Sequence, residues 1–149
     1  MDDRWLPGTE AAQPQLRVLP GAQAAEFGPD WPQMSFEVSP QSDRMGIRLH
    51  GAPLRRNTTA ELFSTAVAPA TVQVPPDGRP IILGVDAQTI GGYPQLAHVI
   101  SVDLPKVAQL RPGDRVRLQP VALAEARQLL LEREARLQLL RRGLEEKFR

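Results

Sequence analysis

Cysteine is absent from this sequence of 149 residues. Its absence excludes a disulfide scaffold, a cysteine nucleophile and a zinc site built on thiolates. Aromatic residues are scarce, with four Phe, two Trp and one Tyr, so aliphatic side chains must fill most of the core. No apolar stretch approaches the roughly 20 residues that a membrane-spanning helix needs. The sequence therefore predicts a protein that does not enter a membrane.

An excess of charge of one sign is lacking too. The formal net charge is only +1, which argues against a surface for nucleic acid or for an anionic membrane. The first residues, MDDRWLPGTEAAQP, lack the basic start and apolar middle of a signal peptide. We therefore expect a cytoplasmic location. The length and a hydrophobic share of 42% suit one domain, or one domain with an appendage.

Short runs of β-branched and bulky residues alternate with turn residues along most of the chain. The clearest strands are predicted at 71–74 and 80–85, on either side of a Pro-Pro-Asp-Gly turn at 75–78. Further strands are predicted at 16–19, 34–38, 46–49, 97–102 and 115–119. Six or seven short strands indicate a mainly β fold, closed or nearly closed into a barrel.

Two helices complete the predicted organisation. Residues 104–110 should form a short helix, with Asp103 as its N-cap and Pro105 at its first position. Strong helix formers without proline follow Pro120 and predict a long terminal helix. The predicted units are thus a flexible lead-in at 1–15, a barrel at 16–120 and a helix at 121–149.

The terminal helix has a leucine every seven residues, which allows two interpretations. The leucines stand at positions 123, 130, 137 and 144, as in a short coiled coil with a partner or a second copy. Alternatively, the helix packs on its own barrel and frays after Gly143. We prefer packing on the barrel for residues 122–131, and both interpretations stay open beyond them.

No catalytic set is recognisable by spacing, so the catalytic residues remain unassigned. His50 and His98 are isolated and fit no metal-ligand pattern, and no metal site is predicted. The polar loop at 41–44 is a better candidate, because binding groups concentrate on loops held by a rigid scaffold. Arg44 could bind a substrate carboxylate through two hydrogen bonds, with Asp43 orienting it. Alternatively, Asp43 and Arg44 brace the loop internally.

A second candidate region follows the strand at 80–85. Gln88 and Thr89 supply amide and hydroxyl groups suited to an amide, lactam or urea-like substrate, or they cap their own loop. Tyr93 either lines a pocket or covers apolar area of the barrel, and we prefer the second interpretation. Gln73 should point away from its apolar neighbours in the strand, and so it faces solvent or lines the barrel mouth.

Four segments resemble one known family when taken in order. They are SPQSDRMGIRLHG (39–51), VQVPPDG (72–78), DAQTIGGYP (86–94) and ISVDLPKVAQLRPGDRV (100–116). Together they resemble the C-terminal half of the biotin-dependent carboxyltransferase-like family, also known as allophanate hydrolase subunit 2 or as the C-type subunit of 5-oxoprolinase. The resemblance runs from about Leu16 to about Leu131. It implies a cyclophilin-like β-barrel with a short helix and a long C-terminal helix.

The resemblance also implies an activity. We expect a subunit or fragment of a complex that opens 5-oxoproline to glutamate with ATP, contributing part of a shared site and inactive alone. The alternatives are carboxyl transfer from carboxybiotin to a urea-like substrate, or, as in Kip-type antagonist relatives, non-catalytic regulation of a kinase inhibitor. In each case, this chain should bind neither ATP nor carboxybiotin itself.

The implied partners are a companion protein of the 5-oxoprolinase B type or the Kip-inhibitor type, and a complementary N-terminal half barrel. The chain has no attachment sequence of the Met-Lys-Met type, so carboxybiotin would be delivered by another protein. Within the shared site, six residues are expected to bind substrate: Asp43, Arg44, Gln73, Gln88, Thr89 and Tyr93.

Overall fold

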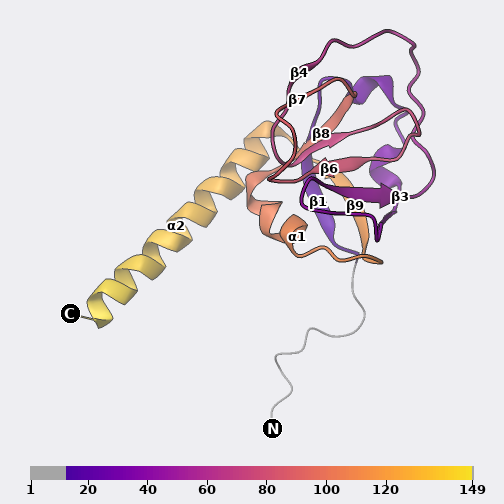
Figure 1. The fold of residues 1–149 in the computed structure, drawn as a ribbon. Coiled ribbons are helices and arrows are strands. Elements are labelled where there is room, and N and C mark those ends of the chain that lie inside the picture. Colours follow the sequence, from indigo (N-terminus) through magenta and orange to yellow (C-terminus); the bar gives the residue numbers. More distant parts are fainter. Residues whose placement is uncertain (1–12, 149) are drawn as a thin grey trace.

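The computed structural model describes residues 13–148 and shows a closed β-barrel with a long helix projecting from it (Figure 1). Within the described residues, seven strands close the barrel in the order β1-β8-β5-β6-β3-β2-β9. Strand β9 returns to β1 in parallel, and the remaining neighbours are antiparallel. The prediction of a mainly β barrel is therefore confirmed. Residues 1–12 of the predicted lead-in lie outside the described residues.

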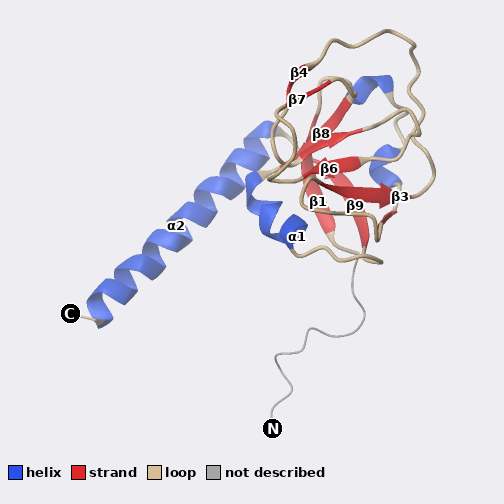
Figure 2. Ribbon diagram, in the orientation of Figure 1, coloured by secondary structure: helices blue, strands red, loops and turns tan. Residues whose placement is uncertain are grey.

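The strands are short, as their spacing along the sequence predicts. Those of the barrel are β1 (Gln15–Pro20), β2 (Phe36–Val38), β3 (Gly46–His50), β5 (Thr71–Gln73), β6 (Ile81–Leu83), β8 (Gln95–Val99) and β9 (Arg115–Pro120). Two further strands, β4 (Thr65–Ala66) and β7 (Ile90–Gly91), form a small separate sheet beside the barrel (Figure 2).

The core consists of aliphatic side chains, because alternate residues of each strand point into the barrel. Leu16 and Val18 of β1 are fully buried, and so are Val116 and Leu118 of the adjacent β9. Burying one such side chain stabilises a fold by about 1.5–3 kcal/mol. Phe36 is the largest side chain buried to this degree among the described residues, which agrees with the scarcity of aromatic residues.

The Pro-Pro-Asp-Gly turn between β5 and β6 forms as predicted. Gly78 has a φ of +75°, and its N–H donates to the carbonyl of Pro75 at 2.9 Å. An added Cβ at this position would lie 2.5 Å from the carbonyl oxygen of Leu54. Both the positive φ and the close approach therefore require glycine here.

Helical segments lie in two of the connections between strands and at the end of the chain. The short ones are three 3-10 turns, η1 (Ala24–Glu26), η2 (Trp31–Gln33) and η3 (Ser101–Asp103). The α-helices are α1 (Leu104–Ala108) and α2 (Leu123–Lys147). The strand predicted at 97–102 ends at Val99, because η3 already turns the chain towards α1. Asp103 is the residue before α1 as predicted, but its side chain does not cap the helix.

Helix α2 leaves the barrel instead of lying along it (Figure 1). The side chains that become half-buried are those of Ala126, Leu129, Leu130 and Arg133, and the rest of the helix is exposed. Arg133 also donates a hydrogen bond to the carbonyl of Ser101 at 3.3 Å. Packing on the barrel, the interpretation preferred for residues 122–131, thus holds for one side of these turns only. The helix does not end at Gly143 but continues to Lys147.

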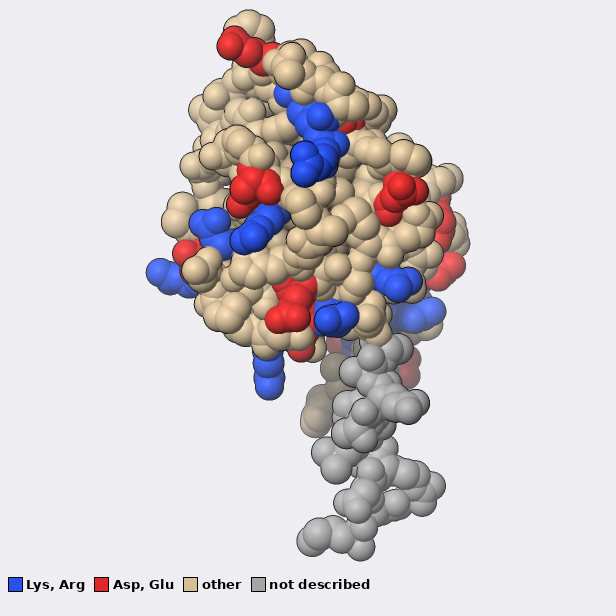
Figure 3. Space-filling model, turned by 90° about the vertical axis from the view of Figure 1, so that its right-hand side faces the viewer, with Lys and Arg blue, Asp and Glu red and all other residues tan. Residues whose placement is uncertain are grey.

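Charged side chains of both signs are interspersed over the face of the barrel in Figure 3. This mixture agrees with the net charge of +1. Neither of the two α-helices in the described part of the chain is long and apolar enough to cross a membrane.

Candidate functional site

The loop between β2 and β3 is folded by its own aspartate. The carboxylate of Asp43 accepts hydrogen bonds from the backbone N–H groups of Met45 at 2.8 Å and Gly46 at 3.2 Å. Backbone hydrogen bonds between Asp43 and Gly46 close the same turn. Asp43 is therefore a loop brace, and its carboxylate holds backbone amides.

Arg44, at the tip of this loop, is open to solvent. Its side chain is 90% exposed and forms an ion pair with Asp86, at 3.4 Å between Nε and Oδ2. Asp86 follows β6, so the ion pair joins the ends of two neighbouring strands. An ion pair between exposed groups contributes only about 0–1 kcal/mol, and it leaves the guanidinium accessible to a carboxylate ligand.

Gly84 brings these two segments together. It follows β6 directly, and its N–H donates to the carbonyl of Met45 at 2.9 Å. A Cβ at this position would lie 2.1 Å from the carbonyl oxygen of Arg44, which no side chain could accommodate without moving the backbone. The strand predicted at 80–85 therefore ends early, and β6 stops at Leu83. The residues after it form the close contact between the two loops.

Gln88 and Thr89 lie in the same loop as Asp86, and both are exposed. The carbonyl of Thr89 accepts a hydrogen bond from the N–H of Val67 at 2.9 Å, which ties the loop to the segment after β4. We call residues 43–45 and 84–89 the polar rim. Four of the six residues expected to bind substrate belong to it: Asp43, Arg44, Gln88 and Thr89.

The other two expected residues lie elsewhere. Gln73 is only 2% exposed, and its Nε2 has no hydrogen-bond partner in the described part of the chain. It packs under β7, where a Cβ on Gly91 would lie 2.7 Å from that nitrogen. The side chain neither faces solvent nor contributes to the exposed rim.

Tyr93 lines a different hollow from Arg44. It is 45% exposed and borders a cavity of about 420 Å³ together with Arg56, Pro75 and Pro76. Arg44 instead borders an apolar groove of about 810 Å³ between the barrel and α1. The six expected residues therefore do not form one pocket.

The sequence did not single out Arg56, which lines the hollow beside Tyr93. Its guanidinium forms an ion pair with Glu26 and donates to the carbonyl of Ala60 at 2.6 Å, while Nη2 is buried without a partner in the described part of the chain. Glu26 lies 30 residues earlier in the sequence, so no local pattern connects the two.

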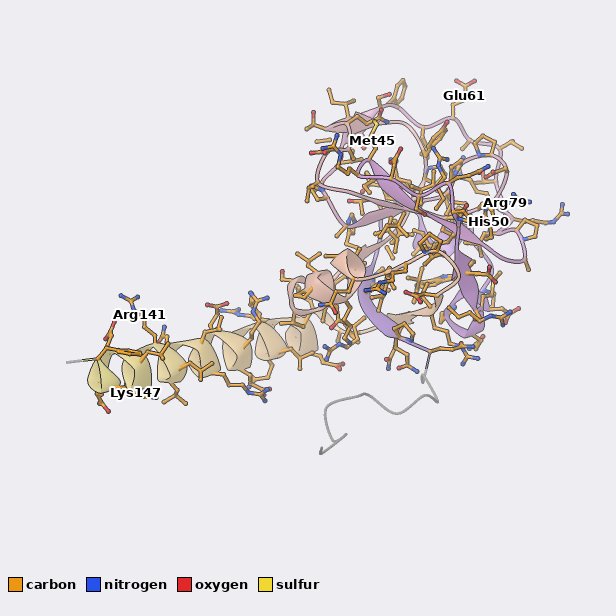
Figure 4. All side chains as sticks on the ribbon, turned by 60° about the horizontal axis from the view of Figure 1, so that its bottom comes forward. Met45, His50, Glu61, Arg79, Arg141 and Lys147 are labelled. Atoms are coloured by element: carbon orange, nitrogen blue, oxygen red, sulfur yellow. The ribbon has the colours of Figure 1, made fainter. Side chains whose placement is uncertain are left out.

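Within the described residues, the two histidines belong to no group that could bind a metal. Within residues 13–148, no group of three or more His, Asp or Glu side chains could hold a metal ion. Nδ1 of His98 lies 3.1 Å from Oγ1 of Thr71, and burial lowers the pKa of this histidine below its ordinary value. His50 lies near Arg79 on the outside of the barrel (Figure 4).

The family follows from a comparison with known sequences. The model of the carboxyltransferase domain, subdomain A and B, matches residues 2–120. This chain belongs to that family. The predicted resemblance is therefore confirmed.

Two curated proteins are similar to this chain over most of its length. The chain is 40% identical to the C-type subunit of 5-oxoprolinase from Haemophilus influenzae over 136 residues, which are 89% of this chain and 44% of that protein. It is 41% identical to the Escherichia coli protein of the same name over 117 residues, 75% of this chain and 37% of that one. The chain thus spans less than half the length of these relatives.

A solved structure agrees with the fold. The urea amidolyase of K. lactis superposes with a TM-score of 0.75 at 23% identity, over 81% of this chain and 8% of that one. At this identity the likeness concerns the fold, which is a barrel within a much larger enzyme.

Proposed function

We propose that this chain is a component of an ATP-dependent 5-oxoprolinase complex, which opens 5-oxoproline to glutamate. The observation that supports this most directly is the 40% identity to the C-type subunit of the Haemophilus influenzae 5-oxoprolinase across 89% of the chain. The chain spans 44% of that relative, and we propose that it contributes one wall of a shared site and is inactive alone.

The exposure of the polar rim supports a shared site. Arg44 is 90% exposed, and in water such a group binds a carboxylate weakly. Large apolar side chains on and beside the rim are exposed as well, among them Met45 at 54%, Val85 at 81% and Ile90 at 62%. Exposed apolar groups gathered around polar ones are typical of a surface that another protein covers.

The rim residues have separable roles in this proposal. Arg44 binds the carboxylate of 5-oxoproline, and Asp43 keeps the loop folded through the amides of its turn. Gln88 and Thr89 hydrogen-bond the lactam amide. During ring opening the lactam C–N bond breaks, water supplies a hydroxyl to the carbon and a proton to the nitrogen, and a second carboxylate forms.

We assign ATP to a companion protein. The described part of the chain contains no group of three or more acidic or histidine side chains that could hold a metal ion. In the same residues, no glycine-rich loop runs into the first turn of either α-helix, where phosphates would be bound.

Reconstitution tests the proposal. The chain should be mixed with a companion protein of the 5-oxoprolinase B type and a complementary N-terminal half barrel, and ATP-dependent glutamate release measured. We expect activity only with all parts present. Arg44→Ala should lower kcat/KM about 10–100-fold, the equivalent of one charged hydrogen bond of about 1.5–3 kcal/mol. Arg79→Ala, an exposed arginine outside the rim, serves as the matched control.

Two outcomes would contradict the proposal at different levels. A reconstituted complex without glutamate release would exclude this chain from a 5-oxoprolinase. An active complex in which Arg44→Ala and Thr89→Ala match the Arg79→Ala control would exclude the rim while retaining the function.

Carboxyl transfer is the second candidate, because the family model that matches residues 2–120 is that of a carboxyltransferase domain. Here carboxybiotin would supply the carboxyl group to a urea-like acceptor. The two lysines of the given sequence, Lys106 and Lys147, are not flanked by methionine, and we assign the biotin carrier to another domain or protein. Avidin should block this activity and leave a 5-oxoprolinase unaffected.

A further inference from the structure

The outer half of α2 has apolar side chains that nothing in the described chain covers. Leu137, Leu140 and Leu144 are 51%, 65% and 56% exposed. Spacings of three, four and seven residues place them on one face of the helix, in line with Leu130 and Ala126. The two latter residues are half-buried at the barrel, so the face that packs on the barrel continues beyond it uncovered.

A second uncovered apolar surface lies at the foot of the same helix. The groove of about 810 Å³ is lined by Leu104, Val107 and Leu110 of α1 and the segment after it, and by Arg133 of α2. Figure 1 shows α1 next to the beginning of α2. Exposed apolar surface beside polar residues is typical of an interaction site.

We propose that two copies of the chain pair through antiparallel α2 helices, in a register that places Leu137 of one copy opposite Leu140 of the other. The same register sets Leu144 against the aliphatic stem of Arg133 of the second copy. It also brings Phe148, which is 80% exposed, to the foot of the second helix beside the groove. One twofold axis thereby covers the exposed face of α2 and the end of the groove beside α1, while the Arg44 end of the groove stays with the polar rim.

The charges beside the leucines determine the orientation. In the antiparallel pair, Glu134 of each helix meets Arg141 of the other, which gives two ion pairs between the copies. A parallel pair would instead place Arg136 next to Arg141 of the other helix, twice over. Within one chain, Glu134 contacts Arg133 and Arg141 contacts Glu145, both at 3.0 Å on the exposed helix. Such contacts can be exchanged at little cost.

The contact should be reversible. Residues 134–148 make a rod of about 22 Å at 1.5 Å per residue. A contact of this length, even with the groove included, belongs with small transient interfaces. We therefore expect a dissociation constant on the order of 10 μM.

Analytical ultracentrifugation of the full chain, from roughly 1 to 200 μM, tests the pairing around that constant. Leu140→Glu should raise the dissociation constant at least about tenfold by placing a charge in the seam. Leu139→Glu is the matched control, because Leu139 is 67% exposed but lies on the opposite side of the helix from the seam. Circular dichroism should show equal helix content in both variants.

The lack of cysteine allows a test of orientation. A mixture of Glu134→Cys and Arg141→Cys chains should form a disulfide between copies. Leu144→Cys alone should not, because the two copies of residue 144 would lie about 16 Å apart along the antiparallel axis, beyond disulfide reach. The double charge exchange E134R/R141E should restore pairing that each single reversal weakens.

Three results would overturn the proposal. The first is a monomer over the whole concentration range. The second is equal loss of pairing in the Leu139→Glu and Leu140→Glu variants. The third is efficient disulfide formation by Leu144→Cys alone, which would indicate a parallel pair.

Discussion

Replacing Asp103 by asparagine should destabilise the barrel more than any other single exchange of carboxylate for amide within residues 13–148. Asp103 is fully buried. Its carboxylate accepts the backbone N–H of Arg17 at 2.9 Å and the guanidinium of the same residue at 3.0 and 2.6 Å. It also pairs with Lys106 at 3.1 Å. This one group therefore connects β1 to η3 and α1.

The magnitude follows from what the exchange leaves behind. Asparagine keeps one carbonyl acceptor but turns an N–H₂ towards the donors of Arg17. Removing one partner of a buried ion pair typically costs about 3–5 kcal/mol. The side chain of Arg17 is 27% exposed and can be partly rehydrated, so we expect about 2–4 kcal/mol. At this chain length, that corresponds to a fall in Tm of roughly 10 °C.

The pH dependence gives a second readout. Burial raises the pKa of Asp103, but the hydrogen bonds from Arg17 and the ion pair with Lys106 outweigh it and hold the pKa below its ordinary value. The stabilisation is therefore fully present above the unfolded pKa of about 3.9 and is lost as pH falls through the folded value. The Asp103→Asn variant should lack this part of the acid dependence.

Urea unfolding, followed by far-ultraviolet circular dichroism at pH 7 and at lower pH, measures both effects. The control is Asp86→Asn, because the exposed pair of Asp86 with Arg44 should contribute less than about 1 kcal/mol. If the two variants differed from the wild type by the same amount, the buried network would not have the role assigned to it.

Three further outcomes are expected from the structure. Because burial lowers the pKa of His98, the unfolded chain takes up a proton first, so stability should decrease as pH falls below about 6.5; urea titrations should show this slope weakened in His98→Gln. Gly84→Ala should cost more than about 2 kcal/mol, because its Cβ would lie 2.1 Å from the Arg44 carbonyl oxygen, whereas Gly28→Ala has no atom within 4 Å and should be near neutral by thermal denaturation. Truncation after Arg133 should leave the Tm of the barrel unchanged within about 2 °C, because every later described side chain is exposed; a larger fall would mean that the outer helix supports the barrel.

Local patterns predicted most of the barrel, because its strands and turns are encoded by neighbouring residues. The Pro-Pro-Asp-Gly turn needs only φ preferences and one glycine, and Gly78 has the positive φ that this requires. Asp103 shows where local reasoning ends. A residue of this type before Leu-Pro predicts an N-cap, yet its carboxylate binds Arg17, 86 residues away, and nothing in the neighbouring sequence specifies that partner.

The candidate site was predicted less completely for the same reason. Strand alternation predicted that Gln73 points away from Val72 and Val74, but alternation says nothing about what covers the outer face. The register of β5 shifts between Val72 and Gln73, and β7 packs over the strand, so all three residues are buried. A loop distant in the sequence thus decided the exposure of the predicted site residue.

The charged groups that stabilise this barrel are different from those that are available to bind a ligand. The charge that is fully buried, on Asp103, is satisfied within the chain by Arg17 and Lys106, so it is not free to bind a ligand. The guanidinium of Arg44 is the reverse case, since it is 90% exposed with one weak partner. Water screens such a group, and a carboxylate would be held firmly only after another surface excluded the solvent. The apolar side chains of Met45 and Val85 beside it are suited to be covered by that surface. A polar rim that needs covering by another surface is what a shared site would require.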